Sequence, residues 1–264
     1  MRKVAVLPSL LTVGNLCCGF LSICLAVRGD ASRGDWEHAA WLIFVAMLFD
    51  AFDGMVARWT RTTSAFGAEL DSLADVVSFG VAPAALIAGM INEHPGEFPF
   101  RVALTFGAFY ATCAALRLAR FNVEPSDHRW FKGLPSPAAG MLIASLVITI
   151  ASLKNPGSSL LFRMFPAGHV VEEFAERVLL HLLPFAALVA GGLMVSRIPY
   201  PHLTGTLLKR RRPFFFLAEL VFAALPIVLL HEYALLGFTS LYVIWGLVLL
   251  ARRPAVEPRE RLVS

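Results

Sequence analysis

The feature that most constrains the fold of this chain is the recurrence of apolar runs close to 20 residues long. A helix of that length crosses a hydrocarbon core of about 30 Å. The 264 residues are 57% hydrophobic and 16% charged, whereas soluble domains are about 45–50% apolar and about 25% charged. Membrane strands would instead alternate in polarity over about ten residues, and the sequence lacks that pattern. It therefore predicts an all-α polytopic membrane protein that forms a single membrane domain.

Polar loops, glycines and prolines divide the chain into about eight predicted transmembrane helices. Pro83 falls inside the third of them and is a candidate kink, because neighbouring helices can satisfy the backbone group that a proline frees. Residues 154–177 are too polar to span and are expected along the membrane interface. The predicted spans are 8–27, 37–59, 65–91, 101–123, 135–153, 178–196, 213–231 and 234–251.

The distribution of lysine and arginine predicts the orientation of these helices. With the N-terminus in the cytoplasm, the loops and tails on that side hold 17 of the 23 basic residues and the other side holds 6. Cytoplasmic loops carry the excess of positive charge, so both termini are predicted there. The run KRRR at 209–212 is expected against anionic headgroups. A net charge of only +4, with the bases at membrane edges, argues against a nucleic-acid partner.

Four aspartates interrupt the apolar sequence in the stretch FDAFDGMVARWTRTTSAFGAELDSLAD. Asp50 and Asp53 lie three residues apart near the end of the second span. Asp71 and Asp75 lie four apart near the start of the third. Both spacings place the two carboxylates on one helix face. Ser64 is a predicted N-cap of the third span, so a tight hairpin would turn the two acidic pairs toward each other.

Carboxylates gathered in a membrane require a neutralising partner, because like charges repel strongly at low dielectric. Hard divalent cations such as Mg²⁺, Mn²⁺ or Ca²⁺ prefer carboxylate oxygens, and a pair of them can bridge a pyrophosphate. Gly54 and Gly67 would open the facing helices to a ligand, and Arg58 would reach phosphate with its guanidinium fork. A simple ion pair would explain one intramembrane aspartate, but four at these spacings indicate a functional site.

The pattern DxxDGxxAR, eight residues, then GxxxDxxxD resembles the CDP-alcohol phosphotransferase family at all eight fixed positions. The resemblance implies a six-helix core, which here would be residues 1–196, followed by a basic loop, two further helices and a tail in 197–264. It also implies a homodimer and a site with two metal ions. By position in the motif, the metal ligands would be Asp50, Asp53, Asp71 and Asp75, with Asp75 also the general base, and the CDP site would be lined by Gly54, Ala57, Arg58 and Gly67.

Four flanking segments resemble the members of this family that use serine as the acceptor: LPSLLTVGNLCCGF, LDSLADVVSFGVAPA, RLARFNV and GLPSPAAG. This resemblance implies transfer of a phosphatidyl group from CDP-diacylglycerol to L-serine, giving phosphatidylserine and CMP. The expected setting is the inner membrane of a bacterium, among membrane lipids, with the active site on the cytoplasmic side.

Several polar residues are candidates for the acceptor and nucleotide pockets. Arg117 and Arg120, three apart, could hold the carboxylate of serine or a phosphate, and Asn122 and Lys132 are nearby polar candidates. For these four, ordinary charge flanking a membrane span is the alternative. Asn15 could bind the nucleotide or make a helix–helix hydrogen bond.

Two other functions remain open from the sequence. Another acceptor, such as glycerol 3-phosphate or an inositol compound, would be expected to need a denser basic pocket. A cation or proton transporter could use the aspartates as a relay, although transporters commonly show inverted repeats or paired broken helices, and neither pattern is evident here.

Overall fold

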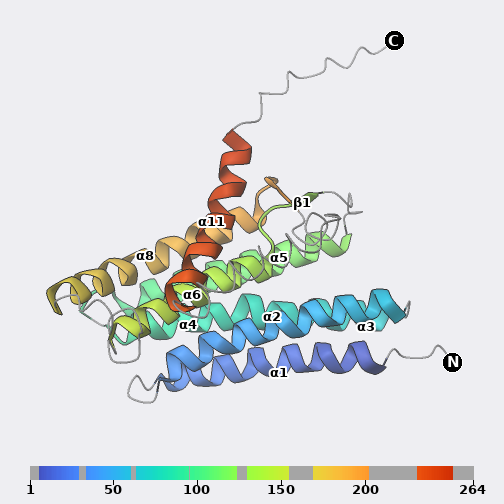
Figure 1. Ribbon diagram of the computed structural model, residues 1–264, viewed down its shortest axis with the longest axis horizontal. Coiled ribbons are helices and arrows are strands. Elements are labelled where there is room, and N and C mark those ends of the chain that lie inside the picture. Colours follow the sequence, from blue (N-terminus) through green and yellow to red (C-terminus); the bar gives the residue numbers. More distant parts are fainter. Residues whose placement is uncertain are drawn as a thin grey trace, which may run out of the picture.

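Long apolar helices account for nearly all of the described structure, a computed structural model (Figure 1). It describes residues 6–29, 34–60, 64–94, 96–123, 130–154, 169–201 and 231–251. The helices are α1 (Val6–Arg28), α2 (Asp35–Thr60), α3 (Ala65–Asp75), the π-helix η2 (Val76–Val81), α4 (Ala82–Asn92), α5 (Phe100–Val123), α6 (Ser136–Lys154), α8 (His169–Val195) and α11 (His231–Ala251). Two short strands, β1 (Trp130–Lys132) and β2 (Pro199–Pro201), pair antiparallel.

Six of these helical segments are long and apolar enough to cross a membrane. They are 9–28, 35–56, 65–92, 100–123, 136–154 and 171–195, which match the first six predicted spans and confirm an α-helical membrane protein. α11 covers the predicted span 234–251, with a shorter apolar stretch at Tyr233–Val248. The predicted span 213–231 lies almost entirely outside the described residues.

α6 is the central helix of the bundle. Fifteen of its 19 residues are buried, because it packs against α2, α4, α8 and α11. α1 and α2 lie side by side in Figure 1 and form the most extensive helix pair among the described residues. α11 crosses the other helices steeply, and its C-terminal part extends away from them (Figure 1).

The all-α fold class holds, and a short β-ribbon pairs the segment before α6 with the segment after α8. Its register pairs Phe131 with Tyr200. The turn that follows β1 depends on Gly133, which has φ +88° and whose added Cβ would lie 2.4 Å from the carbonyl oxygen of Met194. The backbone of Gly133 instead donates to Ile198 O at 2.7 Å. The ribbon therefore joins the start of α6 to the end of α8, a contact between distant segments that local sequence patterns do not reveal.

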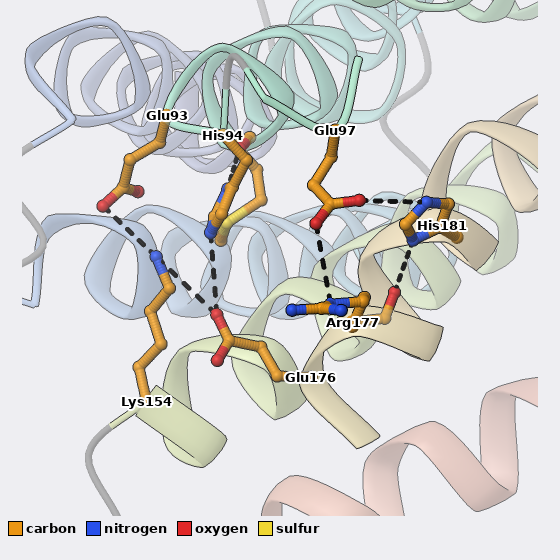
Figure 2. A network of polar contacts seen from close by, with 8 residues as sticks. Glu93, His94, Glu97, Lys154, Glu176, Arg177 and His181 are labelled. Atoms are coloured by element: carbon orange, nitrogen blue, oxygen red, sulfur yellow. Dashed lines mark hydrogen bonds and ion pairs between the residues drawn. The ribbon is translucent and has the colours of Figure 1, made fainter. Parts of the chain in front are cut away.

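The prediction that residues 154–177 form a separate interfacial segment is wrong for its last nine residues. α8 begins at His169 and runs without interruption into the span, and residues 155–168 lie outside the described chain. The charges that suggested a break are paired with the neighbouring helix ends: Glu176 lies 3.9 Å from Lys154 Nζ and 3.6 Å from His94 Nε2 (Figure 2). Because these ion pairs compensate charges within residues 169–177, this polar segment can continue as a helix into the membrane span.

These ion pairs belong to a polar network that connects the C-terminal ends of α4 and α6 to the N-terminal half of α8, which we term the polar clamp (Figure 2). The carboxylate of Glu97 lies 3.6 Å from Arg177 Nε and 3.3 Å from His181 Nε2, both on α8. The clamp lies far from the aspartates, since Glu93 follows Asp75 by eighteen residues, about 27 Å of helix. Its members are Glu93, His94, Glu97, Lys154, Glu176, Arg177 and His181.

The third span contains a π-helical turn directly before Pro83. Within η2 the amide of Ala82 donates to Val77 O, five residues back. Proline has no N–H to donate to the carbonyl of Phe79, four residues earlier. The buried hydroxyl of Tyr110, on α5, donates to that carbonyl at 3.1 Å. The irregularity expected at Pro83 is thus a π turn, in which a side chain of a neighbouring helix donates to the buried Phe79 carbonyl.

Replacing Tyr110 by phenylalanine should lower the free energy of unfolding by about 1–2 kcal/mol, because it removes the hydroxyl donor to a buried carbonyl. Thermal unfolding in detergent would measure the loss. Thr112→Val is the matched control: the Thr112 hydroxyl is exposed and bonds to Ala108 O of its own helix, so its loss should change little. An unaltered melting temperature for Tyr110→Phe would contradict this account of η2.

Candidate catalytic and metal site

The acidic hairpin between α2 and α3 begins as the sequence predicts. Ser64 caps α3, and its Oγ accepts a hydrogen bond from the amide of Gly67 at 3.0 Å. Serine is favoured at this position because it satisfies an amide that the first helical turn leaves unpaired. α3 therefore starts at Ala65 and presents Asp71 and Asp75 toward α2.

Three of the predicted carboxylates converge. Asp50, Asp71 and Asp75 can each offer an oxygen such that all three oxygens lie within 4.8 Å of one another. We call this group the aspartate triad. The central geometric prediction from the sequence, that the two acidic pairs face each other, is confirmed for these three residues.

Asp53 lies beside the triad and has a contact of its own. It is close enough to Asp50 and Asp71 to interact electrostatically with both. Its side chain is buried, and its carboxylate accepts a hydrogen bond from the hydroxyl of Thr12 on α1. The structure does not group Asp53 with the triad, so its predicted part in metal binding stays a prediction.

The chemistry and burial of the triad fit a divalent cation. Asp75 is 9% exposed, and Asp71 Oδ1 is buried with no hydrogen-bond partner among the described residues. Like charges held this close in a poorly solvated site require protons or cations between them. Carboxylate oxygens are the ligands that Mg²⁺, Mn²⁺ and Ca²⁺ prefer. The unpaired oxygen of Asp71 therefore has the properties expected of a metal ligand.

α1 reaches the site through Asn15. Its Nδ2 donates to Asp75 Oδ1 at 3.2 Å, and its side chain is fully buried. Asn15 was predicted near the nucleotide or in a helix–helix hydrogen bond, and the structure gives it a carboxylate partner on α3. Sequence reasoning missed Thr12, although its spacing of three residues from Asn15 places both on one face of α1.

Arg117 is the predicted pocket residue that the structure brings to the triad. It is 8% exposed and interacts electrostatically with Asp75 and Asp50. Its Nη1 donates to Ser136 Oγ at 2.6 Å. A buried guanidinium beside carboxylates can hold a negatively charged substrate group in a fixed orientation.

The other predicted pocket residues make contacts between elements. Arg120 Nη1 donates to Val195 O at 2.8 Å, which satisfies a carbonyl at the C-terminus of α8. Asn122 is exposed and donates to Ser72 Oγ of α3 at 3.0 Å. Lys132 lies in β1. Their roles toward serine or phosphate remain predictions.

Packing among the described residues does not explain the glycine at position 54. A Cβ added at Gly54 would meet no described atom within 4 Å, and one at Gly67 would meet only Ser64 Oγ, at 3.1 Å. Open space beside Gly54 is consistent with a ligand that approaches the helix backbone there, whereas a side chain at Gly67 would press on the capping hydroxyl of Ser64. Ala57 and Arg58 follow Gly54 by three and four residues and lie in the last turn of α2.

The sequence model of the family "CDP-alcohol phosphatidyltransferase" matches residues 5–190. This range includes the whole motif, the triad and both α1 side chains that contact the aspartates. The chain belongs to the CDP-alcohol phosphatidyltransferase family.

Several curated relatives are similar over most of the chain. A CDP-diacylglycerol–serine O-phosphatidyltransferase of Helicobacter pylori is 34% identical over 243 residues, which cover 91% of this chain and 89% of the relative. The archaetidylserine synthase of Methanothermobacter thermautotrophicus is 40% identical over 75% of this chain and 71% of its own length. A CDP-diacylglycerol–serine O-phosphatidyltransferase of Bacillus subtilis is 39% identical over 54% of this chain and 76% of its own.

Gly54→Ala should leave the fold intact yet raise the KM for the nucleotide-linked lipid, because the new methyl group would occupy the space beside the helix. Replacing a helical glycine by alanine should itself stabilise the helix by about 0.5–1 kcal/mol. The control is Gly192→Ala on α8, where an added Cβ also meets no described atom within 4 Å. Steady-state kinetics and thermal unfolding of both variants would test this, and equal kinetics would contradict it.

Proposed function

We propose that this protein transfers the phosphatidyl group of CDP-diacylglycerol to the hydroxyl of L-serine, giving phosphatidylserine and CMP. The observation that carries the proposal is the convergence of the motif's carboxylates in the aspartate triad. The family match supports the reaction type. Relatives that are named for serine and similar over most of the chain support the acceptor.

In this proposal the four aspartates of the motif hold two divalent cations, Mg²⁺, Mn²⁺ or Ca²⁺. When bound, such cations neutralise charge on the pyrophosphate and on the departing CMP. Asp50 and Asp71 would be ligands through the triad, and Asp53 would join them with the carboxylate oxygen that Thr12 leaves available. Gly54, Gly67, Ala57 and Arg58 would line the CDP site.

Asp75 would act as the general base. It is buried within the triad, and Asn15 fixes one of its oxygens, so the other oxygen could face the acceptor. Asp75 takes the proton of the serine hydroxyl as the serine oxygen attacks the phosphorus that carries diacylglycerol. A serine O–P bond forms and the P–O bond to CMP breaks, so that CMP leaves with the electron pair.

Arg117 is our candidate for orienting the acceptor. Its buried guanidinium lies near Asp50 and Asp75, where it could pair with the carboxylate of serine. Glycerol 3-phosphate or an inositol compound would present a phosphate or hydroxyls to the same group. Arg120, Asn122 and Lys132 would contribute by shaping this end of the bundle or by binding the acceptor directly.

The proposed setting is the inner membrane of a bacterium, with both termini and the aspartates on the cytoplasmic side. The distribution of basic residues supports this orientation. We further propose a homodimer surrounded by membrane lipids. Residues 1–196 would form the catalytic core, and 197–264 would add the basic loop, two further helices and the tail.

The acceptor is tested by supplying detergent-solubilised protein with CDP-diacylglycerol and one alcohol at a time. We expect divalent-dependent CMP release with L-serine, and background release with glycerol 3-phosphate or inositol compounds. Mass spectrometry of the lipid product would confirm phosphatidylserine. Faster release with another alcohol would keep the reaction type and overturn the acceptor, whereas activity unaffected by a chelator would overturn the metal assignment.

Asp75→Asn should reduce kcat by about 10²–10⁴-fold or more, the range expected when a general base is removed, while the protein stays folded. The matched control is Glu69→Gln, an exposed acid on the same helix, which should leave kcat unchanged. Turnover by Asp75→Asn at the wild-type rate would refute the base assignment.

A further inference from the structure

We infer that α1 orients the carboxylates of the metal site through two positioning residues, Thr12 and Asn15, and thereby sets the affinity of the site for divalent cations. The inference rests on the proposed function only in taking the aspartates as metal ligands. It assigns to α1 a role beyond spanning the membrane.

α1 makes one hydrogen bond with an aspartate on each of the two helices of the acidic hairpin, α2 and α3. The Thr12 hydroxyl donates to Asp53 Oδ2 on α2, and Asn15 Nδ2 donates to Asp75 Oδ1 on α3. Thr12 is 1% exposed and Asn15 is 0% exposed, so water does not compete for either contact. One helix face therefore contacts both acidic helices at the depth of the triad.

Close packing fixes the position of α1 relative to Asp75. A Cβ at Gly19 would lie 2.3 Å from Ser78 Oγ and 2.8 Å from its Cα, so α1 and η2 are in direct contact at this glycine. Ser78 Oγ donates to the carbonyl of Asn15 at 2.9 Å. Since η2 begins at the residue after Asp75, this anchor holds Asn15 in register with its carboxylate partner.

A purely structural role explains the Asn15 contact poorly. Its Oδ1 is buried and has no hydrogen-bond partner among the described residues. The cost of an unpaired buried acceptor is comparable to the gain from a hydrogen bond to a charged group. The amide therefore adds little net stability, whereas its effect on the orientation of Asp75 is direct.

Each contact occupies one carboxylate oxygen and leaves the other oriented for a ligand. Asp53 keeps Oδ1 for a cation, and Asp75 keeps Oδ2 directed into the site, where a cation or the acceptor hydroxyl would meet it. Without the donor, the carboxylate can rotate and lose that orientation. Partners of metal ligands commonly change metal affinity by about 10–100-fold when they are replaced.

The test is a titration of Mn²⁺ into purified full-length protein in detergent, without substrate, with free Mn²⁺ followed by electron paramagnetic resonance. Thr12→Val keeps the shape of the side chain and removes the donor, and Asn15→Leu does the same at the second contact. We expect each to weaken Mn²⁺ binding by about 10–100-fold, with a fall in melting temperature no larger than that from losing a buried hydrogen bond elsewhere on α1. Thr12→Ser restores the hydroxyl and should restore the affinity.

Ser22→Ala is the matched control on α1. Ser22 is buried and donates to Ala39 O of α2 at 2.7 Å, away from the aspartates. Its loss should affect the melting temperature and leave Mn²⁺ affinity unchanged. Wild-type Mn²⁺ affinity in Thr12→Val and Asn15→Leu would overturn the inference while the proposed function stands. Failure of the wild-type protein itself to bind Mn²⁺ would overturn both.

Discussion

The repulsion among carboxylates placed in a membrane protein is the constraint on which the rest of this structure depends. Asp50, Asp71 and Asp75 approach within 4.8 Å of one another, in surroundings where charge is costly. Helix formation within α2 and α3 does not favour the close approach of these carboxylates, so packing with the surrounding helices must maintain it. The Ser64 cap fixes the start of α3, while Asn15 of α1 and the buried guanidinium of Arg117 interact with the triad itself. A cation that binds the triad would convert the repulsion into attraction.

The two ends of the bundle are stabilised by different means. At one end the polar clamp pairs acidic with basic side chains, so its charges are largely compensated within the protein (Figure 2). At the other end the triad concentrates charge of one sign, with Arg117 as a nearby cation. Ion pairing thus serves stability at the first end, whereas the excess of negative charge at the second serves binding. The repulsion among the triad carboxylates is therefore kept at a distance from the ion pairs that hold α4, α6 and α8 together.

The sequence predicted the features that depend on local periodicity. Apolar runs located six spans, and the three- and four-residue spacing of the aspartates predicted the convergence of Asp50, Asp71 and Asp75. Features that depend on distant segments were not predictable in this way. The β-ribbon joins residues 130–132 to 199–201, and the contact of Thr12 with Asp53 spans forty-one positions. The start of α8 was misplaced because the polarity of its first turns is offset by partners on other helices.

The π turn after Asp75 gives the third span two independently phased halves. In a regular helix every residue is rotated by about 100° from the one before it, so the direction of Asp75 would dictate which side of α4 faces α5 and α6. The widened turn at Val76–Val81 absorbs part of that rotation, and Tyr110 satisfies the carbonyl that the disrupted ladder leaves open. The side chains of α3 can therefore face the ligand site, while α4 independently presents its apolar residues to α5 and α6.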